Sequence, residues 1–174
     1  MLNSTALSAT NDNVDLVALE DGGVAVAYQD SNNVSVRRFS SDGTAGALTS
    51  NVLTDGGTND NEIVIVQIKN QSGDLMVFRQ DRDSAQNMTY NIVGQSGNKT
   101  FDSANGLADG DAYTLSAVAL EDGGVVFAFR DYDGGVWKYN QILIDETGAK
   151  MTTNANSVAN MPDVNHSVRL AALD

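Results

Sequence analysis

The amino-acid sequence predicts an all-β protein built from antiparallel blades of about fifty residues. Three observations predict this fold. Residues 17–24 (Val-Ala-Leu-Glu-Asp-Gly-Gly-Val) recur unchanged as residues 118–125, which is 118 − 17 = 101 positions later. Half of that interval falls on residues 69–74, another turn between two apolar runs. Glycine-containing turns separate the apolar runs along the chain, and no stretch carries a convincing helical period.

Each repeat is expected to contain three clear strands and a weaker fourth. The first strand ends in a tight turn that needs the positive φ glycine accepts. The second strand is almost continuously apolar, which predicts burial on both faces, and the third alternates. The first strands are expected at 14–20, 62–69 and 113–121, and the second at 24–28, 75–79 and 125–129. The third are expected at 34–39, 88–92 and 136–142, and the fourth at 47–53, 99–103 and 151–154.

The repeat suggests one domain, residues 1–174, with units at roughly 13–57, 61–110 and 112–160 and partial units at 1–12 and 165–174. A β-propeller-like ring of blades is the favoured architecture, and a β-sandwich is the alternative. Three blades and two remnants should not close a propeller ring alone. The chain is therefore expected to be either a segment of a longer repeat protein or a unit that self-associates with identical copies.

The composition excludes several kinds of partner. The formal net charge is −13, from 23 acidic and 10 basic residues, so the surface should repel phosphate backbones and anionic lipids. No cysteine is present, which excludes disulfides and thiolate metal sites. No apolar stretch approaches the roughly 20 residues that a membrane span needs. We therefore expect neither nucleic-acid binding nor membrane insertion.

The turn and strand pattern resembles a known family. Leu19-x-Asp21-Gly22-Gly23, an apolar strand, an acidic turn and then Arg38-Phe39 before Asp42-Gly43 are similar to the propeller-type repeats of large secreted bacterial proteins, including RTX adhesins and haemolysin-type calcium-binding proteins. The resemblance implies a secreted or cell-surface location and stabilisation by calcium. The chain departs from the family in two respects. Tyr28, Phe78 and Phe129 stand where the family usually has Trp, and the glycine-rich nonapeptide repeats are absent.

Acidic residues after each second strand are candidate calcium ligands. Calcium takes six to eight oxygen ligands, and alternating Asp side chains around a glycine turn can supply several of them. The alternative is that these side chains only cap the backbone of the turn. A further candidate is the pair Asp109 and Asp111. The main candidates are Asp30, Asp81, Asp83, Asp131 and Asp133.

The third repeat gathers Arg130, Tyr132, Trp137 and Tyr139 around one hairpin. Paired aromatic rings beside an arginine suit stacking on a sugar or binding a peptide carboxylate. The alternative is an aromatic pair packed across two strands. His166, the only histidine, is expected at the surface with no catalytic role.

The sequence favours a non-catalytic binding module of a secreted or surface repeat protein, with loops that bind a glycan or a peptide. A self-associating structural or spacer subunit is the alternative. A fragment of a propeller hydrolase such as a sialidase is a third hypothesis. That class typically needs clustered arginines and a Tyr–Glu pair, and neither is evident here, so we expect no enzymatic activity.

Overall fold

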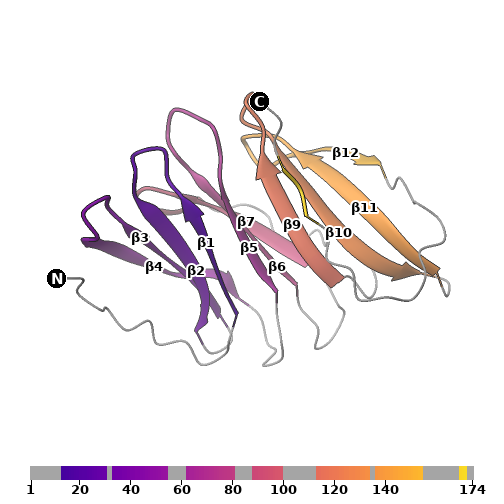
Figure 1. Ribbon diagram of the computed structural model, residues 1–174, viewed down its shortest axis with the longest axis horizontal. Coiled ribbons are helices and arrows are strands. Elements are labelled where there is room, and N and C mark those ends of the chain that lie inside the picture. Colours follow the sequence, from indigo (N-terminus) through magenta and orange to yellow (C-terminus); the bar gives the residue numbers. More distant parts are fainter. Residues whose placement is uncertain are drawn as a thin grey trace.

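The structure consists of three four-stranded antiparallel sheets, one from each repeat. This computed structural model describes residues 13–30, 33–54, 62–80, 88–99, 113–133, 136–154 and 169–171. Figure 1 shows the sheets following one another in chain order, from indigo to orange. The first sheet contains β1 (Val14–Ala18), β2 (Val24–Asp30), β3 (Asn33–Phe39) and β4 (Ala45–Thr54); the second contains β5 (Ile63–Gln67), β6 (Leu75–Gln80), β7 (Met88–Gly94) and β8 (Gly97–Lys99); the third contains β9 (Tyr113–Ala119), β10 (Val125–Asp133), β11 (Val136–Ile144) and β12 (Lys150–Asn154).

The all-β, antiparallel repeat predicted from the sequence is confirmed. Each sheet is a meander in which consecutive strands pair. The fourth strands β8 and β12 are short, with three and five residues, whereas β4, for which the sequence also predicts a weak strand, spans ten residues. The first strands β1, β5 and β9 are neighbours from one sheet to the next. The three sheets do not close into a ring. The finer expectation of a propeller therefore remains a prediction.

The turn after each first strand differs in length between the repeats. In the first repeat Leu19 N–H donates to the Gly23 carbonyl, and in the third Leu120 N–H donates to Gly124, both across five residues. In the second repeat the equivalent bond runs from Ile68 to Asp74, across seven residues. The second turn therefore carries two additional residues, which enlarge this end of the second sheet.

The second sheet is buried on both faces because each neighbouring sheet packs against one of them. Along β6, Leu75 and Val77 belong to the hydrophobic core shared with the first sheet, whereas Met76 and Phe78 belong to the core shared with the third. Every residue of β6 is buried. The prediction that second strands are buried on both faces is thus confirmed for β6, whereas β2 includes half-buried residues because no described sheet covers its outer side.

Aromatic stacking joins the second and third sheets. The rings of Phe78 and Phe127 are stacked with centroids 4.3 Å apart and an interplanar angle of 4°. Phe129 and Tyr90 extend this cluster on either side. The contact between the first and second sheets contains smaller side chains, including Ala25, Ala27, Val34 and Val36.

Side chains of first strands also link one sheet to the next. Asp15 Oδ2 in β1 accepts a 2.9 Å hydrogen bond from Ile65 N–H in β5. Ser116 Oγ in β9 accepts a 2.9 Å bond from Leu170 N–H. Asp15 and Ser116 are equivalent, since they pair with Ala27 and Ala128 of their second strands. Residues 169–171 therefore lie beside β9 much as β5 lies beside β1, in agreement with a partial unit at residues 165–174.

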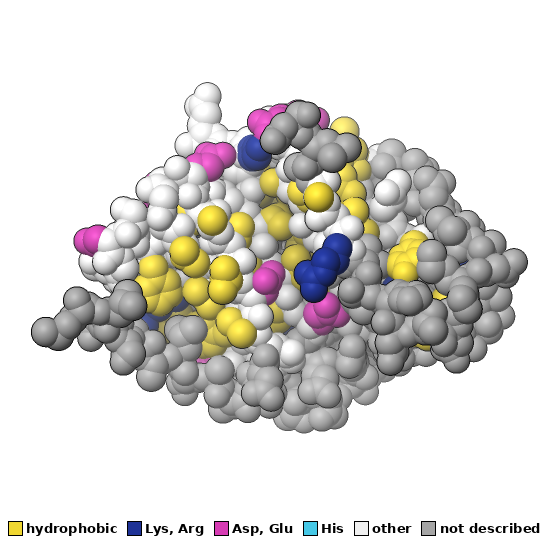
Figure 2. Space-filling view, in the orientation of Figure 1, with side chains coloured by type: hydrophobic (Ala, Val, Ile, Leu, Met, Phe, Trp, Pro, Cys, Tyr) yellow, Lys and Arg dark blue, Asp and Glu magenta, His cyan; other side chains and the backbone are white. Residues whose placement is uncertain are grey.

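The outer face of the first sheet carries exposed apolar side chains, and Arg37 lies among them, paired in the register with Val26 and Leu48. Val14, Leu16 and Leu48 have exposed fractions of 56%, 64% and 42%. Figure 2 shows hydrophobic side chains gathered over this side of the molecule. Across the register, Leu16 pairs with Val26, whose equivalents Val77 and Phe127 both belong to intersheet cores. The exposed face thus retains the apolar character that other repeats use to bind a neighbouring sheet.

The acidic turn predicted in the third repeat is shorter than expected. β10 continues through Asp131 and Asp133, and Tyr132 pairs with Trp137 of β11. Asp131 and Asp133 are therefore strand residues rather than turn residues. The apolar run of residues 125–129 ends before the strand does, because main-chain pairing with β11 extends the hairpin beyond it.

No helix among the described residues is long and apolar enough to cross a membrane.

We expect Phe78→Ala to destabilise the protein by about 3–5 kcal/mol, because it removes a fully buried ring and leaves a cavity against Phe127. Urea unfolding followed by circular dichroism would measure the loss. Met151→Ala is the control, since Met151 is 59% exposed and its truncation should change stability by less than about 0.5 kcal/mol. Similar losses in both variants would contradict the two-faced core.

Candidate functional site

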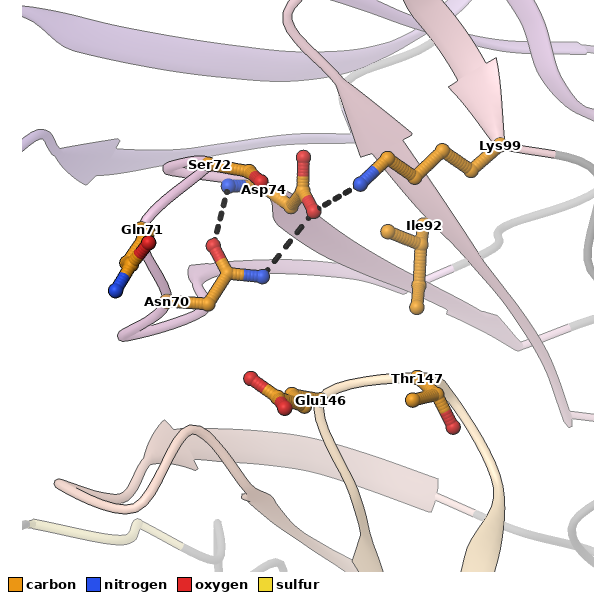
Figure 3. Close-up of a pocket in the computed structure, with 8 residues that line it drawn as sticks. All are labelled: Asn70, Gln71, Ser72, Asp74, Ile92, Lys99, Glu146 and Thr147. Atoms are coloured by element: carbon orange, nitrogen blue, oxygen red, sulfur yellow. Dashed lines mark hydrogen bonds and ion pairs between the residues drawn. The ribbon is translucent and has the colours of Figure 1, made fainter.

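A polar cleft of 590 Å³ opens between the second and third sheets at one end of the strands. We call it the rim cleft. Figure 3 shows side chains of the second sheet on one side of an open space and two side chains of a third-sheet turn on the other. The rim cleft is lined by Asn70, Gln71, Ser72, Asp74, Ile92, Lys99, Glu146 and Thr147.

The longer turn of the second repeat builds one wall. Asn70 Nδ2 donates a 3.1 Å hydrogen bond to Asp74 Oδ2, and Asp74 N–H donates a 3.2 Å bond to Asn70 Oδ1. Lys99, from the end of β8, forms an ion pair with the same Asp74 Oδ2. Asp74 is only 2% exposed, and its Oδ1 has no hydrogen-bond partner among the described residues. The wall therefore holds a buried carboxylate whose charge Lys99 balances.

Asp74 replaces a glycine of the other repeats. At the equivalent Gly23, a Cβ atom would lie 2.3 Å from the Phe39 carbonyl oxygen, so no side chain fits there without a shift. The second repeat differs across the sheet as well, because Gly94 faces the site. A Cβ at Gly94 would lie 3.1 Å from Lys99 Cε and 3.4 Å from Asp74 Oδ1. Gly94 thus leaves the space that the ion pair occupies.

The opposite wall is a rigid turn of the third sheet. Asp145 accepts hydrogen bonds from Thr147 Oγ1, Thr147 N–H and Ala149 N–H at 2.6, 2.9 and 2.8 Å. These bonds, led by the one from the Thr147 hydroxyl, lower the pKa of Asp145. Tyr90 donates a 2.7 Å hydrogen bond from its hydroxyl to the Gly148 carbonyl and so attaches this turn to the second sheet. The turn presents Glu146 and Thr147 to the rim cleft.

The second interface differs from the first at one equivalent position, which only the first repeat fills with a long cationic side chain. Arg38, Ile92 and Leu143 are equivalent, since they pair with Ala25, Met76 and Val126 of the second strands. At the first interface Arg38 reaches across to the second sheet and donates from Nη2 to the carbonyl oxygens of Gly73 at 3.0 Å and Val93 at 3.5 Å. At the second interface Ile92 has neither the length nor the donors to do so.

The electrostatic surroundings of Arg38 show what this space accommodates. Burial lowers the pKa of Arg38, whereas the negative charges of Asp74 and Asp21 raise it. The space between the first two sheets thus accepts a guanidinium group through two carbonyl oxygens and nearby acidic side chains.

The predicted ligand-binding residues of the third repeat do come together, away from the rim cleft. Arg130 pairs with Tyr139 and Tyr132 with Trp137 across β10 and β11. The Arg130 guanidinium lies over the Trp137 ring, 3.5 Å from its centroid. Arg130 is only 6% exposed, so its charged group packs on the indole. This arrangement resembles the packed cross-strand alternative, and binding at these residues remains a prediction.

The predicted calcium ligands are not assembled by the described residues. Asp30 is the last residue of β2, and Asp131 and Asp133 end β10. Asp81, Asp83, Asp109, Asp111 and His166 lie outside the described residues. In the part of the chain that the structure describes, no three acidic or histidine side chains gather as a metal ion would require. Calcium binding therefore remains a prediction.

Sequence reasoning missed the rim cleft, although one signal pointed to it. The segment 68–74 departs from the Leu-Glu-Asp-Gly-Gly turn in both length and composition. An insertion with an Asp in place of a glycine marks the one repeat whose turn differs from the other two. The contribution of Glu146 and Thr147 could not be read this way, because it depends on how the third sheet packs.

We expect Tyr90→Phe to lower stability by about 1 kcal/mol at neutral pH, through loss of the hydrogen bond to Gly148. Burial, followed by the charge of Asp145, raises the pKa of Tyr90 to about 12. A raised pKa of the folded state means that the phenol stabilises the protein below pH 10, and that this contribution is lost as pH rises towards 12.

Urea unfolding at pH 7 and along an alkaline series would measure both effects. The variant should lack part of the alkaline loss and keep the part due to Tyr28, whose pKa burial also raises. Equal stability of variant and parent at pH 7, with identical alkaline slopes, would show that Tyr90 does not hold the wall of the rim cleft.

No protein-family model matches this chain, and no curated protein matches its sequence. The interpretation of the rim cleft therefore depends on the residues that line it and on the comparison between the three repeats.

Proposed function

We propose that the chain is a non-catalytic binding module of a secreted or cell-surface repeat protein, and that its ligand, a glycan or a peptide, binds in the rim cleft. The observation that carries the proposal is a cleft of 590 Å³ lined almost entirely by hydrogen-bonding side chains. Its volume falls within the range of small-ligand sites. Amide, hydroxyl and carboxylate groups on two facing walls can bind the polar groups of either ligand class.

The fixed walls of the rim cleft favour a binding function. The carboxylate of Asp74 accepts from Asn70 and pairs with Lys99, so its Oδ2 is already engaged. Both walls are braced, by the Asn70–Asp74 bonds on one side and by the Asp145 and Tyr90 bonds on the other. A preformed polar site of this kind reduces the entropy lost when a ligand binds.

A propeller-type arrangement is supported by the order of the sheets. In a propeller the first strands surround a central channel. Here β1, β5 and β9 are neighbours, and a groove of 350 Å³ runs along them, with Asp15, Ser116 and Arg169 among its lining residues. The rim cleft lies between two blades in this arrangement, where their turns provide the walls.

We expect screening against a glycan array and a peptide library to identify a ligand, and Glu146→Gln and Asn70→Ala each to weaken its binding several-fold, because each removes a polar group of one wall. Isothermal titration calorimetry would measure the dissociation constants. Glu20→Gln is the control, since Glu20 is an exposed acid in the turn between β1 and β2 and does not line the rim cleft. Binding that responds to none of the rim-cleft variants would refute the assignment of this site.

Calcium stabilisation is part of the proposal, on the acidic residues at and after the ends of the second strands. We expect thermal unfolding in calcium to occur several degrees higher than in excess EDTA. A ligand at a hundredfold excess over its Kd stabilises the folded state by about 2.7 kcal/mol. Superimposed melting curves would show that Asp30, Asp81, Asp83, Asp131 and Asp133 do not bind calcium at the concentrations used.

Self-association is a second candidate function, favoured by the exposed apolar face of the first sheet. Val14, Leu16 and Val26 occupy positions whose equivalents in the other repeats pack against a neighbouring sheet. Burying apolar surface of this kind in an interface contributes roughly 25 cal/mol of stabilisation per Å². We propose a second copy of this chain as the occupant of the face.

We expect sedimentation velocity to show concentration-dependent association of the parent and a shift to monomer in Leu16→Asp. The added charge would have to be buried without a partner. Met151→Asp is the control, because it places the same charge at an exposed apolar residue of β12. A monomeric parent, or equal effects of the two substitutions, would exclude this use of the face.

A further inference from the structure

A guanidinium group lies between the first and second sheets, whereas the equivalent position between the second and third sheets has none. Arg38 bridges the first and second sheets, and Ile92 takes its position between the second and third. Because the two interfaces are built from equivalent strands, the first shows which chemistry the second can accommodate. The inference that follows rests on the proposed binding function and concerns the class of its ligand.

The third sheet repeats the acceptor groups that bind Arg38. Gly73 and Val93, whose carbonyl oxygens accept from Arg38, correspond to Gly123 and Ile144. Gly73 and Gly123 both follow a first strand with positive φ, at 59° and 88°. A carbonyl oxygen can accept two hydrogen bonds, so pairing within the sheet does not prevent it from binding a further donor.

An acidic side chain stands beside these acceptors. A Cβ atom built on Gly123 would lie 3.1 Å from Glu146 Oε2, which places the Glu146 carboxylate next to this turn. The equivalent contact in the second repeat involves the neutral amide of Gln95, whose Nε2 would lie 3.8 Å from a Cβ on Gly73. The third sheet therefore has negative charge at a point where the second has none.

The charges of the rim cleft sum to one negative charge. Lys99 pairs with Asp74, and these two cancel, whereas no ion pair of Glu146 is found among the described residues. The whole chain carries a net charge of −13, which attracts cations towards its surface. A planar cation with several donors matches this carboxylate better than a neutral ligand does.

We propose that the rim cleft binds the guanidinium group of an arginine side chain presented by a peptide. The side chain enters between the two sheets, its methylene groups lie against Ile92, and its guanidinium donates to the Glu146 carboxylate, which lies next to the turn that carries Gly123. The ligand thus supplies between the second and third sheets what Arg38 supplies between the first and second.

The test measures the binding of three probes to the full chain by isothermal titration calorimetry. Two are the acetylated and amidated tripeptides Gly-Arg-Gly and Gly-citrulline-Gly, and the third is the single blocked residue N-acetylarginine amide. Citrulline keeps the shape of arginine and removes its charge. We expect the citrulline peptide to bind at least roughly tenfold more weakly than the arginine peptide, and added salt to weaken only the arginine probes. Comparison of the peptide with the free amide separates recognition of a peptide from recognition of the guanidinium alone.

Two substitutions locate the site. Glu146→Gln should weaken the arginine peptide roughly tenfold and leave the citrulline peptide nearly unchanged. Ile92→Arg should copy the arrangement of Arg38, fill the rim cleft from within and abolish binding. Because Ile92 is 3% exposed, the fold of this variant is checked by its circular dichroism spectrum and melting temperature. Glu146→Gln keeps the test decisive if Ile92→Arg does not fold.

The outcomes separate the ligand class from the binding function. Equal binding of the arginine and citrulline peptides, or arginine binding that neither substitution changes, would overturn the proposal. If a neutral glycan or peptide bound instead and Ile92→Arg abolished that binding, the rim cleft would still be the binding site and only the guanidinium inference would fail. If a ligand bound and its binding responded to neither substitution, both the inference and the proposed site would be wrong.

Discussion

The burial of the second sheet on both faces is the constraint on which the rest of the structure depends. An antiparallel sheet usually keeps one face in water, and its strands then alternate between apolar and polar residues. Here β6 is buried throughout, and its two faces contribute to two separate cores. The sheets must therefore stack in chain order, and the turns at their ends are brought together in fixed pairs. Both the rim cleft and the link through Arg38 arise where these turns meet.

Departures from the repeat explain the site better than the repeat itself does. The common pattern supplies the strands, the glycine turns and the apolar contacts. The site appears where the second repeat replaces a glycine with Asp74 and lengthens the preceding turn by two residues. Ile92 stands there at the position that only the first repeat fills with an arginine. Each change alters size or charge at one equivalent position. A repeated scaffold thereby acquires one distinct cleft without a change of fold.

The sequence was sufficient to predict the strands, their antiparallel order and the glycine turns, because these follow from local apolar runs and from residues that accept positive φ. It also brought Arg130 and Trp137 together correctly, because both flank one hairpin. It placed Asp131 and Asp133 in a turn, since side-chain polarity does not reveal how far main-chain pairing extends. The rim cleft escaped prediction because Asp74 and Glu146 are 72 positions apart (146 − 74), and only the packing of two sheets makes them neighbours.

The exposed face of the first sheet and the open rim cleft follow from the same physical rule. The side chains on each face of a stacked sheet match the chemistry of the neighbouring sheet. Where no neighbour is present, they still indicate which chemistry would fit there. On the first sheet the absent partner is apolar, because the equivalents of Val26 are packed against side chains such as Phe78. In the rim cleft the absent partner is cationic, because the equivalent space is filled by Arg38. The contacts within the molecule thus specify the chemistry of what should bind outside it.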